Sequence, residues 1–165
     1  MSVPQRPSAA HLIELLELKA LPAQGGLFRQ SWRSSLQVDA HGKPRPAGTA
    51  IYALLSDELW HFYLGDAIKM LLLHPDGRVE RIALGADLLG GQVLQAVVPA
   101  GCWMGARLLP GGRYGLFGCT SAPGFIEADC EGGDARLASQ YPQAAGEIAA
   151  LLREGVPLSM PHAPD

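Results

Sequence analysis

Cysteine is scarce in this sequence, which has three among 165 residues: Cys102, Cys119 and Cys130. The number is odd and no C-x-x-C pair occurs, so neither a disulfide framework nor a zinc knuckle is indicated. We interpret Cys102 and Cys119 as small buried hydrophobic side chains. A reduced, cytoplasmic protein is the expectation that follows.

Charge is also scarce, because charged residues make up 18% of the chain and the net charge is −3. Nucleic-acid-binding domains carry clustered positive charge, so we expect no nucleic-acid partner. Hydrophobic residues make up 48% of the chain, which is more than one small interior should bury. We therefore predict a homodimer that forms through segment 27–35 and the sheet face that carries His61.

Long apolar runs are missing as well. None approaches the roughly 18 residues that would cross a bilayer, so we expect no membrane partner. Near the N-terminus, Glu14 and Glu17 interrupt the apolar positions, which argues against a signal peptide. We predict a short helix there instead, capped by Ser8.

Short strands and turns dominate the rest of the chain. Between residues 25 and 131, apolar or alternating runs are separated by turns such as "HPDGR" (74–78) and "LPGGR" (109–113). About eight strands with this spacing predict a sandwich or barrel. Segment 39–48 is expected to be an exposed loop whose Lys43 and Arg45 are solvated.

Helical periodicity returns near the C-terminus. We expect helices at 134–154, followed by a Pro-rich tail at 156–165. With a barrel at about 25–131, the whole chain, 1–165, is predicted to form a single domain.

Four blocks of sequence point to a known family. They are "LPAQGGLFRQSWRSS" (21–35), "GTAIYALL" with "DELWHFYLGD" (48–55 and 57–66), "LGADLLGGQVLQAVVPAGCW" (84–103) and "YGLFGCTSAPGFIEAD" (114–129). In this order they resemble the cupin superfamily, in particular its cupin-like (RmlC-like jelly-roll) domain family of unknown function. The resemblance implies an all-β fold with flanking helices: a double-stranded β-helix around a central cavity, usually dimeric.

The two sequence motifs of cupins are only partly present. Glu58 and Gly65 match the end of the first motif, and Pro99 with Gly101 match the second. Met104 stands where the second motif has its histidine. The His-x-His of the first motif is missing, because the two strands are joined almost directly at Ser56-Asp57.

A cupin metal site needs several histidines and a carboxylate around one ion. Only His61 lies on a predicted barrel strand, whereas the other four histidines, His11, His41, His74 and His162, lie elsewhere. We therefore predict no metal and no other cofactor.

The segment "SDELWHFYLGD" (56–66) carries the strongest candidate site. Side chains alternate between the two faces of a strand, so Glu58, Trp60 and Phe62 share one face and His61 takes the other. A carboxylate among aromatic rings is desolvated, which raises its pKa and suits a general base or a ligand anchor. The alternative for Glu58 is a silent ion pair with an arginine from a predicted strand, one of Arg29, Arg33 and Arg107.

The remaining candidates are Met104, Trp103, Tyr52 and His61. Met104, at the motif position, is expected to line the pocket. Trp103 then packs in the core or an interface unless the strand bulges, and Tyr52 is a further pocket candidate. His61 is either a structural histidine, bonded to a neighbouring strand or a dimer partner, or part of the pocket. The predicted ligand-binding set is Tyr52, Glu58, Trp60, Phe62, Trp103 and Met104.

Two functional hypotheses from different classes follow. The first is a module that binds a small polar or sugar-like molecule without turnover. The second is a metal-independent sugar epimerase or isomerase that pairs Glu58 with Tyr52 or His61, because such chemistry needs an acid and a base on opposite sides of one carbon. A structural or storage role is a third alternative.

Overall fold

The computed structural model describes residues 7–20, 27–40, 42–54, 59–129, 131–152 and 158. Its first element is a short helix, α1 (Ala9–Leu15), whose start is set by Ser8. The Ser8 hydroxyl accepts a hydrogen bond from the backbone N–H of His11 at 3.2 Å, as the sequence predicts for an N-cap. None of the described helices is long and apolar enough to cross a membrane.

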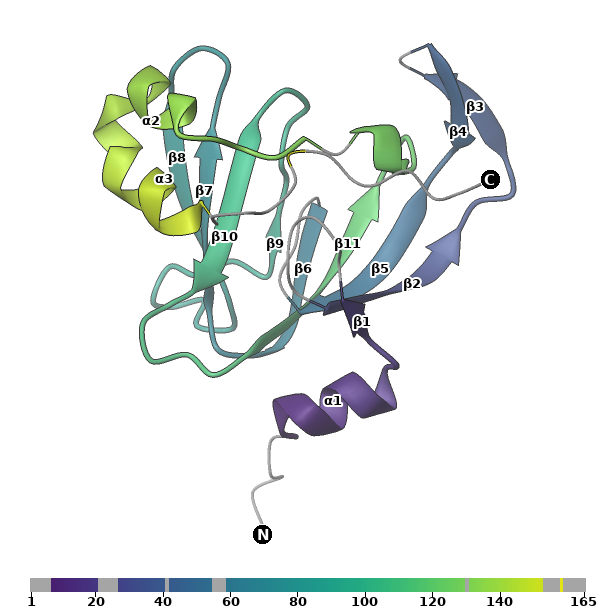
Figure 1. Cartoon of the computed structure of the whole chain (residues 1–165). Coiled ribbons are helices and arrows are strands. Elements are labelled where there is room, and N and C mark those ends of the chain that lie inside the picture. The colour runs from purple at the N-terminus through teal and green to yellow at the C-terminus, as the bar shows by residue number, and fades with distance from the viewer. Residues whose placement is uncertain are drawn as a thin grey trace, which may run out of the picture.

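Two β-sheets form the body of the molecule (Figure 1). The larger sheet has six strands in the order β1-β2-β5-β11-β6-β9, and the smaller has three in the order β10-β7-β8. The strands of the larger sheet are β1 (Lys19–Ala20), β2 (Leu27–Arg33), β5 (Thr49–Leu54), β6 (Leu59–Gly65), β9 (Gln95–Ala96) and β11 (Gly115–Ser121). Those of the smaller sheet are β7 (Ile68–Leu73), β8 (Val79–Leu84) and β10 (Trp103–Leu108).

Turns join consecutive strands at the positions that the sequence predicts. The turn at 74–78 links β7 to β8, with a backbone hydrogen bond from Gly77 N–H to the His74 carbonyl at 2.9 Å. Gly77 has φ of +88°, a conformation that glycine adopts without steric cost. The turn at 109–113 leads from β10 to β11 and so connects the two sheets.

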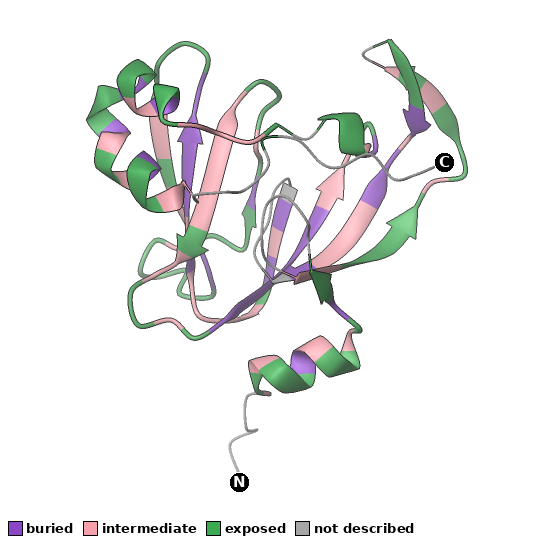
Figure 2. Cartoon of the chain, viewed as in Figure 1, coloured by how far each residue is buried: buried purple, intermediate pink, exposed green. Residues whose placement is uncertain are grey.

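The inner faces of the two sheets pack together and form the main core (Figure 2). Strands β5, β6 and β11 meet β7 and β8 there, which places apolar side chains of alternate positions in one interior. The buried members are Ala53, Trp60, Phe62, Ile68, Met70, Leu84, Ala96, Phe117 and Cys119.

The C-terminal helices cover the outer face of the smaller sheet (Figure 1). They are α2 (Arg136–Gln140) and α3 (Ala145–Leu151), with a 3-10 turn at Pro142–Ala144 between them. Leu71 and Leu73 of β7 pack against Leu137 and Ile148 of these helices. The predicted all-β architecture with short N- and C-terminal helices is thus confirmed.

Segment 39–48 differs from the sequence-based expectation. It contributes to a hairpin, β3 (Gln37–Ala40) with β4 (Lys43–Pro46), and Arg45 is only 3% exposed. The Arg45 guanidinium pairs with both carboxylate oxygens of Asp129, and its Nε donates to the Ala40 carbonyl at 3.1 Å. The prediction of a solvated Arg45 was wrong. Asp129, which is distant in the sequence, pairs with the guanidinium and offsets the free-energy cost of removing its charge from water.

One carboxylate fixes α3 to the smaller sheet. Glu147 pairs with Lys69 of β7 and with Arg81 of β8, both at 2.6 Å. Hydrogen bonds from Arg81 and then Lys69 lower the pKa of Glu147 to about 2. Its contribution to stability is therefore complete above the usual carboxyl pKa and is lost as pH falls towards 2.

We expect Glu147→Gln to lower the free energy of unfolding at pH 7 by about 1–2 kcal/mol, since the site is partly exposed and screened. Urea denaturation at pH 7 and pH 2.5 measures this, and the difference from wild type should shrink at the lower pH. An equal difference at both values would contradict the assignment.

Candidate functional site

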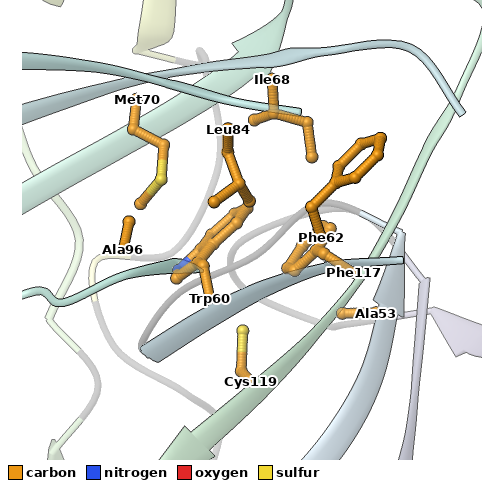
Figure 3. Packing of buried hydrophobic residues seen from close by; sticks show 9 residues of the cluster. All are labelled: Ala53, Trp60, Phe62, Ile68, Met70, Leu84, Ala96, Phe117 and Cys119. Carbon is orange, nitrogen blue, oxygen red and sulfur yellow. The ribbon is translucent and has the colours of Figure 1, made fainter. Parts of the chain in front are cut away.

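Aromatic rings form the centre of the core between the two sheets. Trp60 of β6 and Phe117 of β11 are both fully buried, and their rings stack with centroids 3.9 Å apart and planes at 7°. Figure 3 shows Met70 and Leu84 pointing from the opposite sheet towards Trp60. Phe62, two residues after Trp60, lies in the same cluster, as strict alternation along β6 requires.

Several side chains that border the core are only partly buried. Phe28 of β2, Ile51 of β5, and Met104 and Ala106 of β10 pack against the buried cluster yet are only partly buried themselves. They come from both sheets, on strands β2 and β5 of the larger sheet and β10 of the smaller one. These four side chains are apolar, so they offer van der Waals contact and no charge.

Among the described residues, one buried polar side-chain atom in this apolar cluster has no hydrogen-bond partner. The indole Nε1 of Trp60 is buried and finds no hydrogen-bond acceptor among the described residues. An indole N–H is a donor only, and burying it without an acceptor costs about 1–3 kcal/mol. Such an orphan donor in a native interior calls for an explanation, and a bound oxygen atom is one.

The opposite face of the larger sheet carries the other candidates. His61 pairs in register with Gly118 and Gln95, and Gly118 pairs with Tyr52, so one row of residues crosses four strands. The Gln95 side-chain amide donates to His61 Nδ1 at 2.9 Å, and Nε2 lies 3.4 Å from Thr120 Oγ1. Both imidazole nitrogens are thus engaged with neighbouring strands, which fits the structural interpretation of His61.

Tyr52 belongs to an aromatic pair on this same face. Its ring meets Tyr63 edge-on, with centroids 6.0 Å apart. A Cβ at Gly118 would lie 2.1 Å from the Tyr63 hydroxyl, so the ring crosses the strand only because residue 118 is glycine. Burial, and then the neighbouring Tyr52, raise the pKa of Tyr63, which keeps its phenol protonated at neutral pH.

The two neighbouring residues at the second motif, Trp103 and Met104, pack into different clusters. Met104 faces the interior, whereas Trp103 packs with the cluster formed by Leu71, Leu73 and the C-terminal helices. Glu58 and the Ser56-Asp57 junction lie outside the described residues. The structure therefore brings Trp60, Phe62 and Met104 together and places Tyr52, His61 and Trp103 elsewhere.

Comparison with known proteins decides the family. A family model described as "Cupin superfamily (DUF985)" matches residues 10–132, which is most of the chain. The chain belongs to the cupin superfamily. The fold expected from the four sequence blocks is thereby confirmed.

Solved structures and curated sequences agree with this assignment. A hypothetical protein from Leishmania major matches this cupin with a TM-score of 0.79 and 29% identity, over 90% of this chain and 100% of the other. Protein SO0799 from Shewanella oneidensis matches with a TM-score of 0.78 and 30% identity, over 90% and 99% of the two chains. The uncharacterized yeast protein YML079W (Saccharomyces cerevisiae) is 28% identical, over 78% of each chain.

The donor atoms of this cupin do not suit a metal ion in the described part of the barrel. Met104 supplies a thioether where the cupin motif has a histidine, and His61 lies on the other face of its sheet. Among the described residues no group of three or more His, Cys, Asp or Glu side chains is arranged to hold an ion. Glu58 and His41 lie outside the described residues, so this statement does not cover them.

Sequence reasoning missed Phe28 and Ile51 as interior residues of this cupin. The segment containing Phe28 was assigned to a dimer contact, and Ile51 was passed over in favour of Tyr52. A signal was available, because Phe28 alternates with Arg29 and Ile51 with Tyr52, and the apolar member of each pair faces inward.

Proposed function

We propose that this cupin binds a small polar, sugar-like metabolite between its two sheets, next to Trp60, and needs no metal ion to do so. The observation that carries the proposal is the buried Trp60 Nε1, which has no acceptor among the described residues. A ligand hydroxyl or carbonyl oxygen would accept that hydrogen bond and remove the cost of the unpaired donor.

The surroundings of Trp60 suit such a ligand. Apolar side chains with a few fixed polar groups are typical of small-molecule sites. Phe28, Ile51 and Met104 offer the apolar contact. Glu58 stands two residues before Trp60 in the sequence, and its role as the second polar anchor stays a prediction from strand alternation.

The epimerase or isomerase alternative is less well supported. It needs an acid and a base on two sides of one substrate carbon. Its candidates, Tyr52 and His61, lie on the face of the sheet opposite to Trp60 and Phe62. Binding without turnover is therefore the function that we favour.

A thermal-shift screen with nucleotide sugars, monosaccharides and amino acids tests this proposal. A ligand at 100 times its Kd should stabilise the protein by about 2.7 kcal/mol. Trp60→Phe keeps an aromatic ring but removes the N–H, so it should weaken binding of a hit about tenfold. Trp103→Phe is the matched control and should bind as wild type. Equal losses in both variants would contradict a specific role for Trp60.

A second pair of variants separates Glu58 from His61. We expect Glu58→Gln to weaken binding at least tenfold while the melting temperature changes little, because it removes only the charge of the predicted anchor. We expect His61→Gln to act on stability or dimerisation, since His61 contacts Gln95 and Thr120. Calorimetric titration with a hit from the screen measures both. Reversed effects would move the site to the outer face of the sheet.

We also propose a homodimer, formed through segment 27–35 and the sheet face that carries His61. Trp32 is 52% exposed and Tyr63 is 47% exposed, so large aromatic surfaces are uncovered in the single chain. Burying such surface is the usual driving force for association. Analytical ultracentrifugation at micromolar concentration should show a dimer, and Trp32→Glu should shift it towards monomer. A wild-type monomer would refute the proposal.

A further inference from the structure

A cysteine, a histidine and a glutamate form a connected row at one end of the smaller sheet, apart from the barrel interior. Cys102, in the loop before β10, places its Sγ 3.2 Å from His74 Nδ1 in the turn after β7. His74 Nε2 lies 2.9 Å from Glu80 Oε2, near the start of β8. A nucleophile, a base and a group that orients the base occur in this order in enzymes with activated thiols.

Glu80 sets the tautomer of His74. Hydrogen bonds from His74 and then Arg78 lower the pKa of Glu80, so its carboxylate is ionised at neutral pH. An ionised carboxylate accepts only, which requires His74 Nε2 to carry the proton. His74 Nδ1 then carries a lone pair that lies within hydrogen-bond distance of two donors, the Arg78 guanidinium and the Cys102 thiol.

The backbone of His74 is fixed by hydrogen bonds on both sides. His74 is 5% exposed, its carbonyl accepts a hydrogen bond from the Tyr141 hydroxyl at 2.8 Å, and its backbone N–H donates to the Arg78 carbonyl at 2.9 Å. The C-terminal helical segment thus anchors the turn that carries the base. Cys102, at the other end of the row, is partly exposed.

A cation accompanies the row. Arg78 lies with Nη2 3.0 Å from His74 Nδ1 and with Nη1 2.9 Å from Glu80 Oε2. Burial raises the pKa of Cys102, while the nearby Arg78 opposes that rise. Cys102 is therefore a neutral thiol at rest, with a base beside it and a positive charge near the position where negative charge would form.

The arrangement of Cys102, His74 and Glu80 argues against metal binding and against acyl transfer. His74 contacts Cys102 and Glu80 through opposite ring nitrogens, so the three side chains do not converge on one metal ion. Acyl transfer needs donors for an oxyanion, and the backbone N–H of Cys102 already donates to the Pro99 carbonyl at 3.2 Å. A small oxidant whose leaving group must gain a proton fits better.

We propose that Cys102 is a hydroperoxide-reactive thiol, in which His74 carries the proton and Glu80 positions His74. The Cys102 sulfur attacks one oxygen of the hydroperoxide, and an S–O bond forms as the O–O bond breaks. His74 Nδ1 takes the thiol proton and delivers it to the departing oxygen, which leaves as water or an alcohol. Cys102 is oxidised by two electrons to a sulfenic acid, the peroxide is reduced by two, and Arg78 stabilises the departing oxygen.

The test treats the full-length protein with hydrogen peroxide and follows Cys102 by sulfenic-acid trapping and peptide mass spectrometry. Burial by itself disfavours the Cys102 thiolate, so any acceleration must come from proton transfer by His74. We expect that transfer to make Cys102 react at least tenfold faster than it does in the urea-unfolded chain. Cys102→Ser identifies the adduct against the background from the other two cysteines. Comparable rates in the folded and the unfolded chain would overturn the proposal.

Positioning variants distinguish proton delivery from a structural role. We expect His74→Gln to slow the reaction with peroxide about 100-fold and Glu80→Gln about tenfold. Glu147→Gln, a carboxylate of the same sheet region outside the row, is the matched control and should react as wild type. Circular dichroism and melting curves establish that each variant is folded.

A second electrophile sharpens the result. Both reagents need His74 to take the thiol proton, but iodoacetamide releases iodide, which needs no proton. In His74→Gln the iodoacetamide reaction should therefore lose only the help with deprotonation, whereas the peroxide reaction should also lose proton delivery and so slow more. Glu80→Gln serves the same comparison if His74→Gln fails to fold. Equal losses with both reagents, or no loss with peroxide in a folded variant, would overturn the role of His74 as the proton carrier.

Discussion

Replacing Trp60 by alanine should lower the free energy of unfolding by about 3–5 kcal/mol, the largest effect that we expect from any single substitution in this chain. Trp60 is 0% exposed and stacks on Phe117, and residues of both sheets surround it. Its removal deletes one of the largest side chains packed between the two sheets and leaves a cavity that the surrounding strands close only in part. Equilibrium urea unfolding measures the loss.

Two variants calibrate this expectation. Trp60→Phe retains most of the buried ring and should cost about 1–2 kcal/mol. Trp32→Ala, at a tryptophan that is 52% exposed, should change stability by about 0.5 kcal/mol in the monomer. A small effect of Trp60→Ala, similar to that of Trp32→Ala, would show that Trp60 is not a core residue.

Asp129→Ala is expected to have the second largest effect, lowering the free energy of unfolding by about 2–3 kcal/mol. The buried guanidinium of Arg45 would then have no carboxylate partner among the described residues. Arg45 is 3% exposed, and Asp129 is its only carboxylate partner among the described residues. The Asp129 side chain is itself partly exposed, so the expected loss lies below that of a fully buried pair. Thermal and urea unfolding report the change.

The double variant Arg45→Met with Asp129→Leu is the control for this second prediction. It removes both charges and replaces them with apolar groups, so it should be more stable than Asp129→Ala alone. A double variant at least as unstable as the single one would mean that packing, and not the uncompensated charge, explains the loss.

Much of the architecture follows from local sequence. Turn residues at 74–78 and the Ser8 cap act within a few residues of themselves, so their geometry can be predicted without a structure. The period of two along β6 places Trp60 and Phe62 on one face and His61 on the other, because alternation is a property of the strand itself.

Other features depend on which strands become neighbours. The sequence alone suggested a solvated Arg45, but its partner Asp129 is 84 residues away along the chain. Cys102 was interpreted as a small hydrophobic residue, and the register of β10 with β7 places it beside His74. Neither contact has a local signal, because a side chain finds such partners only after the sheets have formed.

The sequence by itself therefore determined the cupin family, the strand-rich fold with terminal helices, and the alternation that puts Trp60 inside. Only the tertiary structure decided that Trp103 packs with the cluster under the C-terminal helices, that Phe28 and Ile51 pack against the core, and that Trp60 lacks an acceptor among the described residues. The physical reason is how far apart in the sequence the interacting residues lie. Turn and strand preferences act between residues close in sequence, whereas burial, pairing and the surroundings of a donor depend on segments that meet only in the folded chain.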